Sequence, residues 1–144
     1  MPDQELFKRY QSINDLIEDF KYLDDWEDRY AYLIDLGKAL TGLPEELKSD
    51  EHKVRGCTSQ VWLVHEERLE AGKNLHYFAA DSDAFIVRGL VSIVLSAYSG
   101  KSAEEILEVD LSSIFIEIGL ERNLSVSRRN GFAAMIERVQ TAVK

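Results

Sequence analysis

The only cysteine of this chain, Cys57, stands in a short segment whose residue types suit sulfur chemistry. Gly56 precedes the thiol and permits a tight turn or a positive φ at that point. Thr58 and Ser59 follow it with hydroxyl groups that can donate hydrogen bonds. These residues describe a thiol on a turn, so the segment is the first candidate for a reactive site.

Two cations, Lys53 and Arg55, precede Cys57 in a chain that is otherwise acidic. Nearby positive charge favours the thiolate, which is the nucleophile in sulfur exchange. The spacing therefore predicts a partly activated thiol. The alternative is an inert buried cysteine, which is the common condition of an isolated cysteine.

Other cysteine chemistries need groups beyond the thiol. A hydrolase pairs the nucleophile with a histidine, and the candidates are His52, His65 and His76. His52 stays open because it lies in a loop five residues before Cys57, whereas His65 and His76 occupy expected strand positions without an associated motif. An iron–sulfur cluster or a Cys-rich zinc site needs three or four thiolates, and the chain supplies one. We therefore expect no metal site, and a Cys–His hydrolase is the weaker alternative.

Length and composition predict one globular domain spanning residues 1–144, with 45% hydrophobic and 30% charged residues. The chain has 17 Lys plus Arg against 26 Asp plus Glu, a net charge of −9. This balance argues against sequence-independent nucleic-acid binding, which needs clustered cations. A single cysteine, no signal-peptide pattern at the start and no long apolar run predict a cytoplasmic protein without a membrane anchor.

Hydrophobic periodicity predicts two amphipathic helices near the start of the chain. Ser12 is the expected N-cap of the first, and Asp24 or Asp25 that of the second, which should end before Gly42. We expect the two helices to form an antiparallel pair over the core.

Residues 61–64 and 75–79 have the β-branched and aromatic character of strands, and residues 70–74 have the composition of a turn between them. A third short strand is expected around residues 53–55. The predicted fold class is therefore α+β, a small antiparallel sheet of about three strands packed against helices. Cys57 would then lie on a turn at the head of a strand.

A helix from residue 84 to about residue 98 is apolar nearly all round and should be the central helix of the core. Asp83 is its expected N-cap, which typically stabilises a helix by about 1 kcal/mol. Ser102 should cap a short helix, and Asp110 or Leu111 should begin another.

The last helix is predicted from an apolar stripe formed by Phe132, Met135, Ile136, Val139 and Val143. Arg128 and Arg129 stand at its N-terminal end, although a helix N-terminus favours anions over cations. Two interpretations stay open: both arginines are solvated, or Arg128 forms an anion site with the helix dipole and free backbone donors, suited to a thiolate, a persulfide or a carboxylate.

Four ordered blocks of this sequence resemble the SufE family of cysteine-desulfurase activators, which includes the CsdE-type proteins. The blocks are residues 26–30 with 36–37, residues 54–63 with Gly-Cys-x-Ser-x-Val-Trp at their centre, residues 81–90, and residues 127–131 with Met135. Many relatives read His-Leu-Ser/Thr-Pro-Ser-Arg where this chain has Asn-Leu-Ser-Val-Ser-Arg at residues 123–128. The histidine and the proline are missing here, but Arg128 is present.

The resemblance implies an α+β fold similar to the IscU-type scaffolds, without their cluster ligands and without a cofactor of its own. It implies that Cys57 accepts persulfide sulfur from a pyridoxal-phosphate-dependent cysteine desulfurase similar to SufS or CsdA, and relays it for iron–sulfur cluster assembly. A scaffold similar to SufB is the expected acceptor. Such a protein is a carrier and activator rather than a stand-alone enzyme; a regulatory partner of the desulfurase with an incidental thiol is the alternative.

By the same resemblance, Gly56, Ser59, Asp83 and Arg128 support the loop that carries Cys57. A carboxylate at one helix start and a guanidinium at another could pair and lock this loop. We expect the resting thiol to be tucked against apolar side chains until a partner releases it. Dimerisation through the same face is allowed and would have to be undone for docking.

Overall fold

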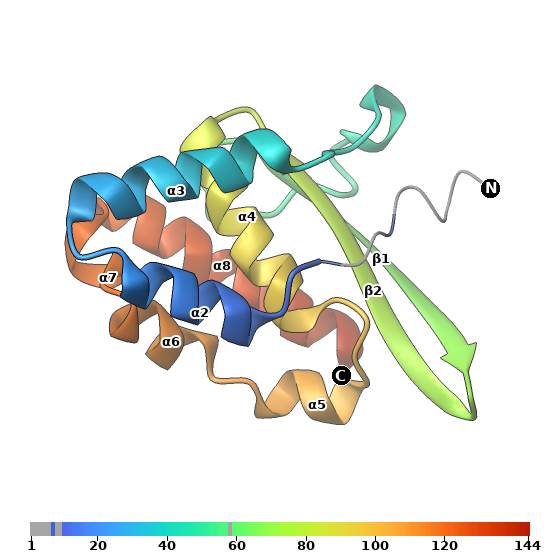
Figure 1. The fold of residues 1–144 in the computed structure, drawn as a ribbon. Coiled ribbons are helices and arrows are strands. Elements are labelled where there is room, and N and C mark those ends of the chain that lie inside the picture. Colours follow the sequence, from blue (N-terminus) through green and yellow to red (C-terminus); the bar gives the residue numbers. More distant parts are fainter. Residues whose placement is uncertain (1–6, 8–9, 58) are drawn as a thin grey trace.

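The computed structural model describes residue 7, residues 10–57 and residues 59–144. Figure 1 shows the N-terminal helices, a hairpin and the C-terminal helices arranged around a central helix. The elements in chain order are α2 (Ile13–Tyr22), α3 (Trp26–Ala39), a 3₁₀ turn (Glu45–Leu47), β1 (Val61–Glu70), β2 (Lys73–Ser82), α4 (Phe85–Tyr98), α5 (Ala103–Glu108), α6 (Leu111–Glu117), α7 (Leu120–Asn123) and α8 (Val126–Val143). The α+β class is confirmed.

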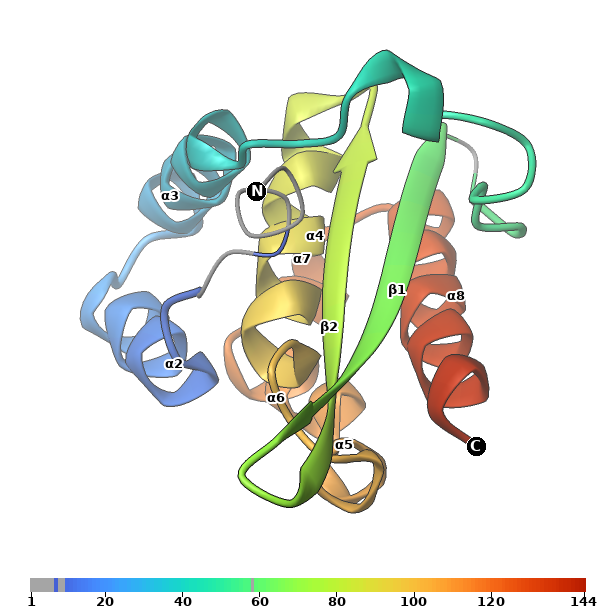
Figure 2. The same cartoon turned by 90° about the vertical axis from the view of Figure 1, so that its right-hand side faces the viewer.

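Helix α4 is the centre of the fold because almost every side chain along it is apolar and buried. The hairpin covers one side of α4, while α3 and α8 pack against it elsewhere (Figure 2). The core fills the space between these elements, with Phe20, Phe78, Leu90 and Tyr98 among its fully buried side chains. Among the described residues, no helix is long and apolar enough to cross a membrane.

Helices α3 and α4 approach each other at backbone distance through two glycines. A Cβ atom on Gly89 would overlap the carbonyl oxygen of Leu33, and one on Gly37 would overlap that of Phe85. Neither position has room for any side chain, so the sequence requires glycine at both. This contact fixes the N-terminal helices on the core.

The sheet differs from the prediction in strand number and length. Strands β1 and β2 pair antiparallel along ten residues each, from Val61 opposite Ser82 to Glu70 opposite Lys73. The turn between them uses positive φ values at residues 71 and 72. The predicted third strand around residues 53–55 is wrong: a single bridge joins Lys53 to Trp62, because the chain turns away towards Gly56 directly afterwards.

The helix starts agree with the predicted caps at four places. Ser12 accepts a hydrogen bond from Asp15 N, Asp25 precedes α3, Ser102 forms a capping box, and Asp110 caps α6. The last helix is longer than its apolar stripe, since it begins at Val126 after the Ser125 cap. The short helix α7 is an addition to the predicted elements.

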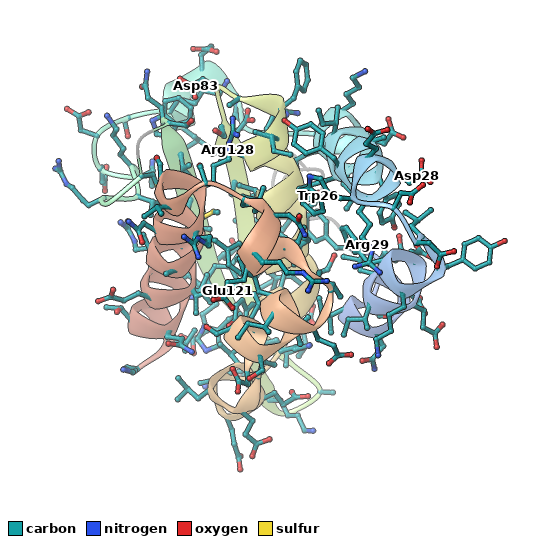
Figure 3. The ribbon with its side chains drawn as sticks, turned by 90° about the vertical axis from the view of Figure 1, so that its left-hand side faces the viewer. Trp26, Asp28, Arg29, Asp83, Glu121 and Arg128 are labelled. Carbon is teal, nitrogen blue, oxygen red and sulfur yellow. The ribbon has the colours of Figure 1, made fainter. Side chains whose placement is uncertain are left out.

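Arg29 connects the N-terminal helices with the segment between α6 and α7. Its guanidinium donates to the carbonyl of Leu23 at 2.7 Å and to that of Ile118 at 2.8 Å. Figure 3 shows Arg29 between α2, α3 and the C-terminal helices. Gly119 follows with a φ of +80°, which turns the chain into α7 beside this guanidinium.

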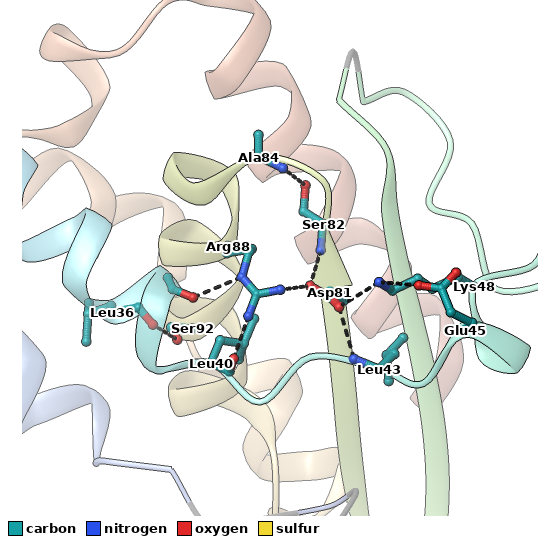
Figure 4. A network of polar contacts seen from close by, with 11 residues as sticks. Leu36, Leu40, Leu43, Glu45, Lys48, Asp81, Ser82, Ala84, Arg88 and Ser92 are labelled. Atoms are coloured by element: carbon teal, nitrogen blue, oxygen red, sulfur yellow. Dashed lines mark hydrogen bonds and ion pairs between the residues drawn. The ribbon is translucent and has the colours of Figure 1, made fainter.

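A buried carboxylate joins three parts of the fold near the start of α4 (Figure 4). Asp81 accepts from the backbone of Leu43 at 3.0 Å and of Ser82 at 2.7 Å, and it pairs with Arg88 and, at 3.3 Å, with Lys48. Arg88 also donates to the carbonyls of residues 37 and 40 at the end of α3. The network therefore fixes the connection from α3 to β1, which leads to the cysteine segment.

Candidate functional site

Cys57 lies on the turn that leads into β1, as predicted, and its thiol faces α8. Gly56 has a φ of +92°, the conformation that favours glycine, so the prediction of a positive φ before the thiol is confirmed. The Sγ atom donates to the carbonyl oxygen of Gly131 at 3.6 Å, and the residue is partly buried. The thiol is thus held between its own turn and one helix.

A small cavity of about 20 Å³ adjoins the thiol. Its walls come from the cysteine turn, from α4 and from the first half of α8: Cys57, Ser59, Val87, Leu90, Ser127, Arg128, Gly131, Phe132 and Met135. Most of these side chains are apolar, and of the described residues that line the cavity Arg128 alone carries a charge. The cavity is therefore a small, mostly apolar space that opens next to sulfur.

Burial raises the pKa of the Cys57 thiol above its ordinary value. The prediction that Lys53 and Arg55 activate the thiol is wrong for this conformation, because desolvation is what shifts its pKa. Arg138 of α8 donates to the backbone carbonyl of Lys53 at 3.2 Å, so α8 holds the start of the segment as well as the thiol. Burial in this conformation therefore favours the protonated thiol over the thiolate.

Asp83 supports the cysteine segment in a way that differs from the predicted cap. The cap position of α4 is Ala84, whose N–H donates to Ser82 Oγ at 3.3 Å. Asp83 instead accepts from the backbone N–H of Gln60 at 3.2 Å, and its own N–H donates to the Gln60 carbonyl at 3.3 Å. These two hydrogen bonds connect the C-terminal side of the cysteine turn with the start of α4.

The side chains of Arg128 and Arg129 line two different cavities beside α8. Arg128 lines the cysteine cavity, and its backbone N–H donates to the Ser125 hydroxyl, so that donor is already used by the cap. Arg129 lines a separate groove of about 470 Å³ between α6 and α8. Asp83 and Arg128 lie towards the same end of the molecule (Figure 3), but the described residues show no ion pair between them, and the predicted lock is wrong in this state.

All three histidines are engaged away from Cys57. His52 Nδ1 lies 3.0 Å from the Leu47 carbonyl oxygen, while His65 Nε2 and His76 Nδ1 lie 2.7 Å apart with their rings stacked. None of them is among the described residues that line the cysteine cavity. The arrangement provides no base for a Cys–His hydrolase.

Of the predicted site, Cys57, Ser59 and Arg128 line the same cavity, and Gly56 is the chain neighbour of Cys57. Asp83 is connected to this site through its hydrogen bonds with Gln60. Thr58 lies outside the described residues. The described chain holds no group of three or more His, Cys, Asp or Glu side chains that could bind a metal ion.

Sequence reasoning missed Gly131, Phe132 and Met135 as walls of the thiol cavity, together with the Arg138 anchor. The available signal was a glycine, Gly131, inside an otherwise helical pattern, since such a glycine often marks a close approach of another group.

The geometry agrees with the comparisons with known proteins. A sequence model of SufE, described as the Fe-S metabolism associated domain, matches residues 14–143. The chain belongs to the SufE family. A SufE-like protein from Rhizobium etli is 52% identical over 133 residues, covering 92% of this chain and 90% of its own length. Another SufE-like protein, from Rhizobium meliloti, is 50% identical over 130 residues, covering 90% of this chain and 93% of its own length.

One SufE relative carries a functional name. The sulfur acceptor protein CsdE of Escherichia coli is 42% identical over 125 residues, covering 87% of this chain and 83% of its own length. A solution structure of a hypothetical protein from Thermus thermophilus matches with a TM-score of 0.68 at 24% identity, covering 94% of this chain and 96% of that one. That likeness shows the fold alone.

Proposed function

We propose that the protein is a sulfur acceptor that takes a sulfane sulfur from a cysteine desulfurase onto Cys57. The observation that carries the proposal is the placement of the single thiol beside a small, largely apolar cavity. A persulfide held there would be kept from water and from reducing thiols. The family membership and the name of the Escherichia coli relative support a role in sulfur transfer.

The transfer is a thiol exchange at sulfur. The Cys57 thiolate attacks the outer sulfur of a persulfide on the desulfurase, the S–S bond of the donor breaks, and its electron pair leaves with the donor thiolate. The product is Cys57–S–SH, with no net oxidation. A pyridoxal-phosphate enzyme would supply the donor persulfide; the acceptor protein needs only its thiol.

Docking and activation are coupled in this proposal. The resting thiol is protonated because burial raises its pKa, and the same burial hides it from a bulky donor. A partner that draws the cysteine turn out of the cavity would remove the desolvation and lower the pKa of the thiol. Asp83, which binds Gln60 of this turn, and Arg128, which lines the cavity, are the proposed supports of the two conformations.

The onward acceptor is proposed to be an iron–sulfur assembly scaffold in the cytoplasm, in keeping with the description of the family model. A homodimer that covers the cysteine face stays a prediction. Sedimentation of the free chain, alone and with the desulfurase, tests it, since a dimer through this face should dissociate when the desulfurase binds.

The test is incubation with a cysteine desulfurase and free cysteine, followed by intact-mass analysis without reductant. We expect one sulfur atom to be added to the wild-type chain and none to Cys57→Ser. If the protein were only a regulatory partner with an incidental thiol, the Cys57→Ser variant would stimulate the desulfurase as well as the wild-type chain does. Absence of added sulfur on the wild-type chain would contradict the acceptor role.

A further inference from the structure

Gly131 stands opposite the Cys57 thiol in the first half of α8, and no local feature explains why it is a glycine. It lies within an 18-residue helix and is not among the glycines with positive φ. A glycine inside a helix is less favourable than alanine. The reason for a glycine at position 131 must therefore lie in the groups that this position faces.

The free thiol is not that reason. A Cβ atom at position 131 would lie 3.5 Å from Cys57 Sγ and 3.9 Å from Cys57 Cβ, both ordinary van der Waals contacts. Alanine would fit against the resting thiol without displacing it. The space that glycine leaves open is unused until something is added to the sulfur.

The size of the cavity indicates what that addition is. A cavity of this kind needs roughly 10–15 Å³ to hold one water molecule, and this one has about 20 Å³. A sulfur atom bonded to Sγ lies about 2.05 Å from it. An outer sulfur on Cys57 would take up much of this space, and an alanine methyl at position 131 would compete with it.

We infer that Gly131 makes the space that holds one added sulfur on Cys57 and limits the cargo to that single atom. The inference rests on the proposed function. A longer cargo would need the outer sulfur of Cys57–S–S⁻ to attack another donor persulfide, giving Cys57–S–S–SH and a donor thiolate. An outer sulfur that points into the cavity towards Gly131 is turned away from a docked donor, so we expect the addition of sulfur to stop at one atom.

The test uses two donors, the desulfurase with cysteine and an excess of inorganic tetrasulfide, and counts sulfur atoms by intact mass. We expect the wild-type chain to hold one sulfur with either donor. Gly131→Ala should keep the fold and its rate of thiol alkylation, but should accept two or more sulfurs from tetrasulfide. Its persulfide should also be lost to dithiothreitol faster by about tenfold or more, since the outer sulfur no longer fits the cavity.

The matched control is Thr141→Ala, an exposed and uncharged position on the same helix that should behave as the wild-type chain. Two or more sulfurs on the wild-type chain, or a Gly131→Ala persulfide as resistant as the wild-type one, would overturn the inference. The wild-type count does not depend on how the variant folds. Failure to load from the desulfurase, with normal loading from tetrasulfide, would instead refute the proposed function and leave the role of Gly131 standing.

Discussion

Replacing Asp81 with alanine should destabilise the fold strongly, because this carboxylate is 3% exposed and Arg88 and Lys48 both depend on it. Breaking a buried ion pair from one side typically costs about 3–5 kcal/mol. The partners are 18% and 22% exposed, so water can reach them in part and the lower end, about 3 kcal/mol, is expected. Domains are stable by only about 5–15 kcal/mol, so this is a large share.

Urea unfolding followed by circular dichroism measures the change. Glu117→Ala is the control, since Glu117 forms an exposed pair with Lys21 and its loss should cost about 1 kcal/mol or less. The double variant Asp81→Ala with Arg88→Met removes both charges and should recover part of the stability, because no uncompensated guanidinium remains. A loss for Asp81→Ala no larger than that for Glu117→Ala would refute the assigned role of the network.

Three further changes test other contacts. Gly89→Ala should destabilise the fold by about 1–3 kcal/mol or more in the same urea assay, because the methyl group would overlap a backbone carbonyl of α3; unchanged stability would contradict the close helix contact. Asp83→Ala should leave the midpoint of unfolding nearly unchanged but speed alkylation of Cys57, since the side-chain oxygen that accepts from the Gln60 N–H is lost; an unchanged alkylation rate would mean that Asp83 does not hold the turn. Burial and the neighbouring His76 lower the pKa of His65. The stability that depends on neutral His65 should therefore be fully present above about pH 6.5 and fall as the pH drops below it, because the unfolded chain takes up the proton first. His65→Phe should reduce this pH dependence in unfolding curves recorded from about pH 7.5 to about pH 5.

Local signals predict much of this fold because their causes are local. Ser12, Ser102 and Asp110 cap helices through hydrogen bonds to residues three positions on, so the sequence contains the whole interaction. The positive φ at Gly56 is likewise a property of one residue. The apolar stripe places the start of α8 too late because the first turn of this helix is polar, although the Ser125 cap is visible in the sequence.

Contacts between distant segments lie beyond the sequence pattern. Asp83 has the position and chemistry of a cap, but the cysteine turn comes close enough for its carboxylate to bind Gln60 instead. The state of Cys57 differs from its prediction for a similar reason: two cations stand near it in the sequence, whereas burial against α8 determines the direction of its pKa shift. Burial depends on which helix covers a segment, and that is decided by the whole fold.

If the proposed function holds, the cavity beside Cys57 also affects how partners would distinguish an empty molecule from a loaded one. Under this proposal, cargo that sits beside the thiol, in about 20 Å³ between α4 and α8, leaves the outer shape of the cysteine face almost unaltered. Empty and loaded molecules would then compete on nearly equal terms for the same desulfurase. Turnover would depend on the ratio of the two forms, and rapid unloading by the acceptor would keep the donor enzyme free.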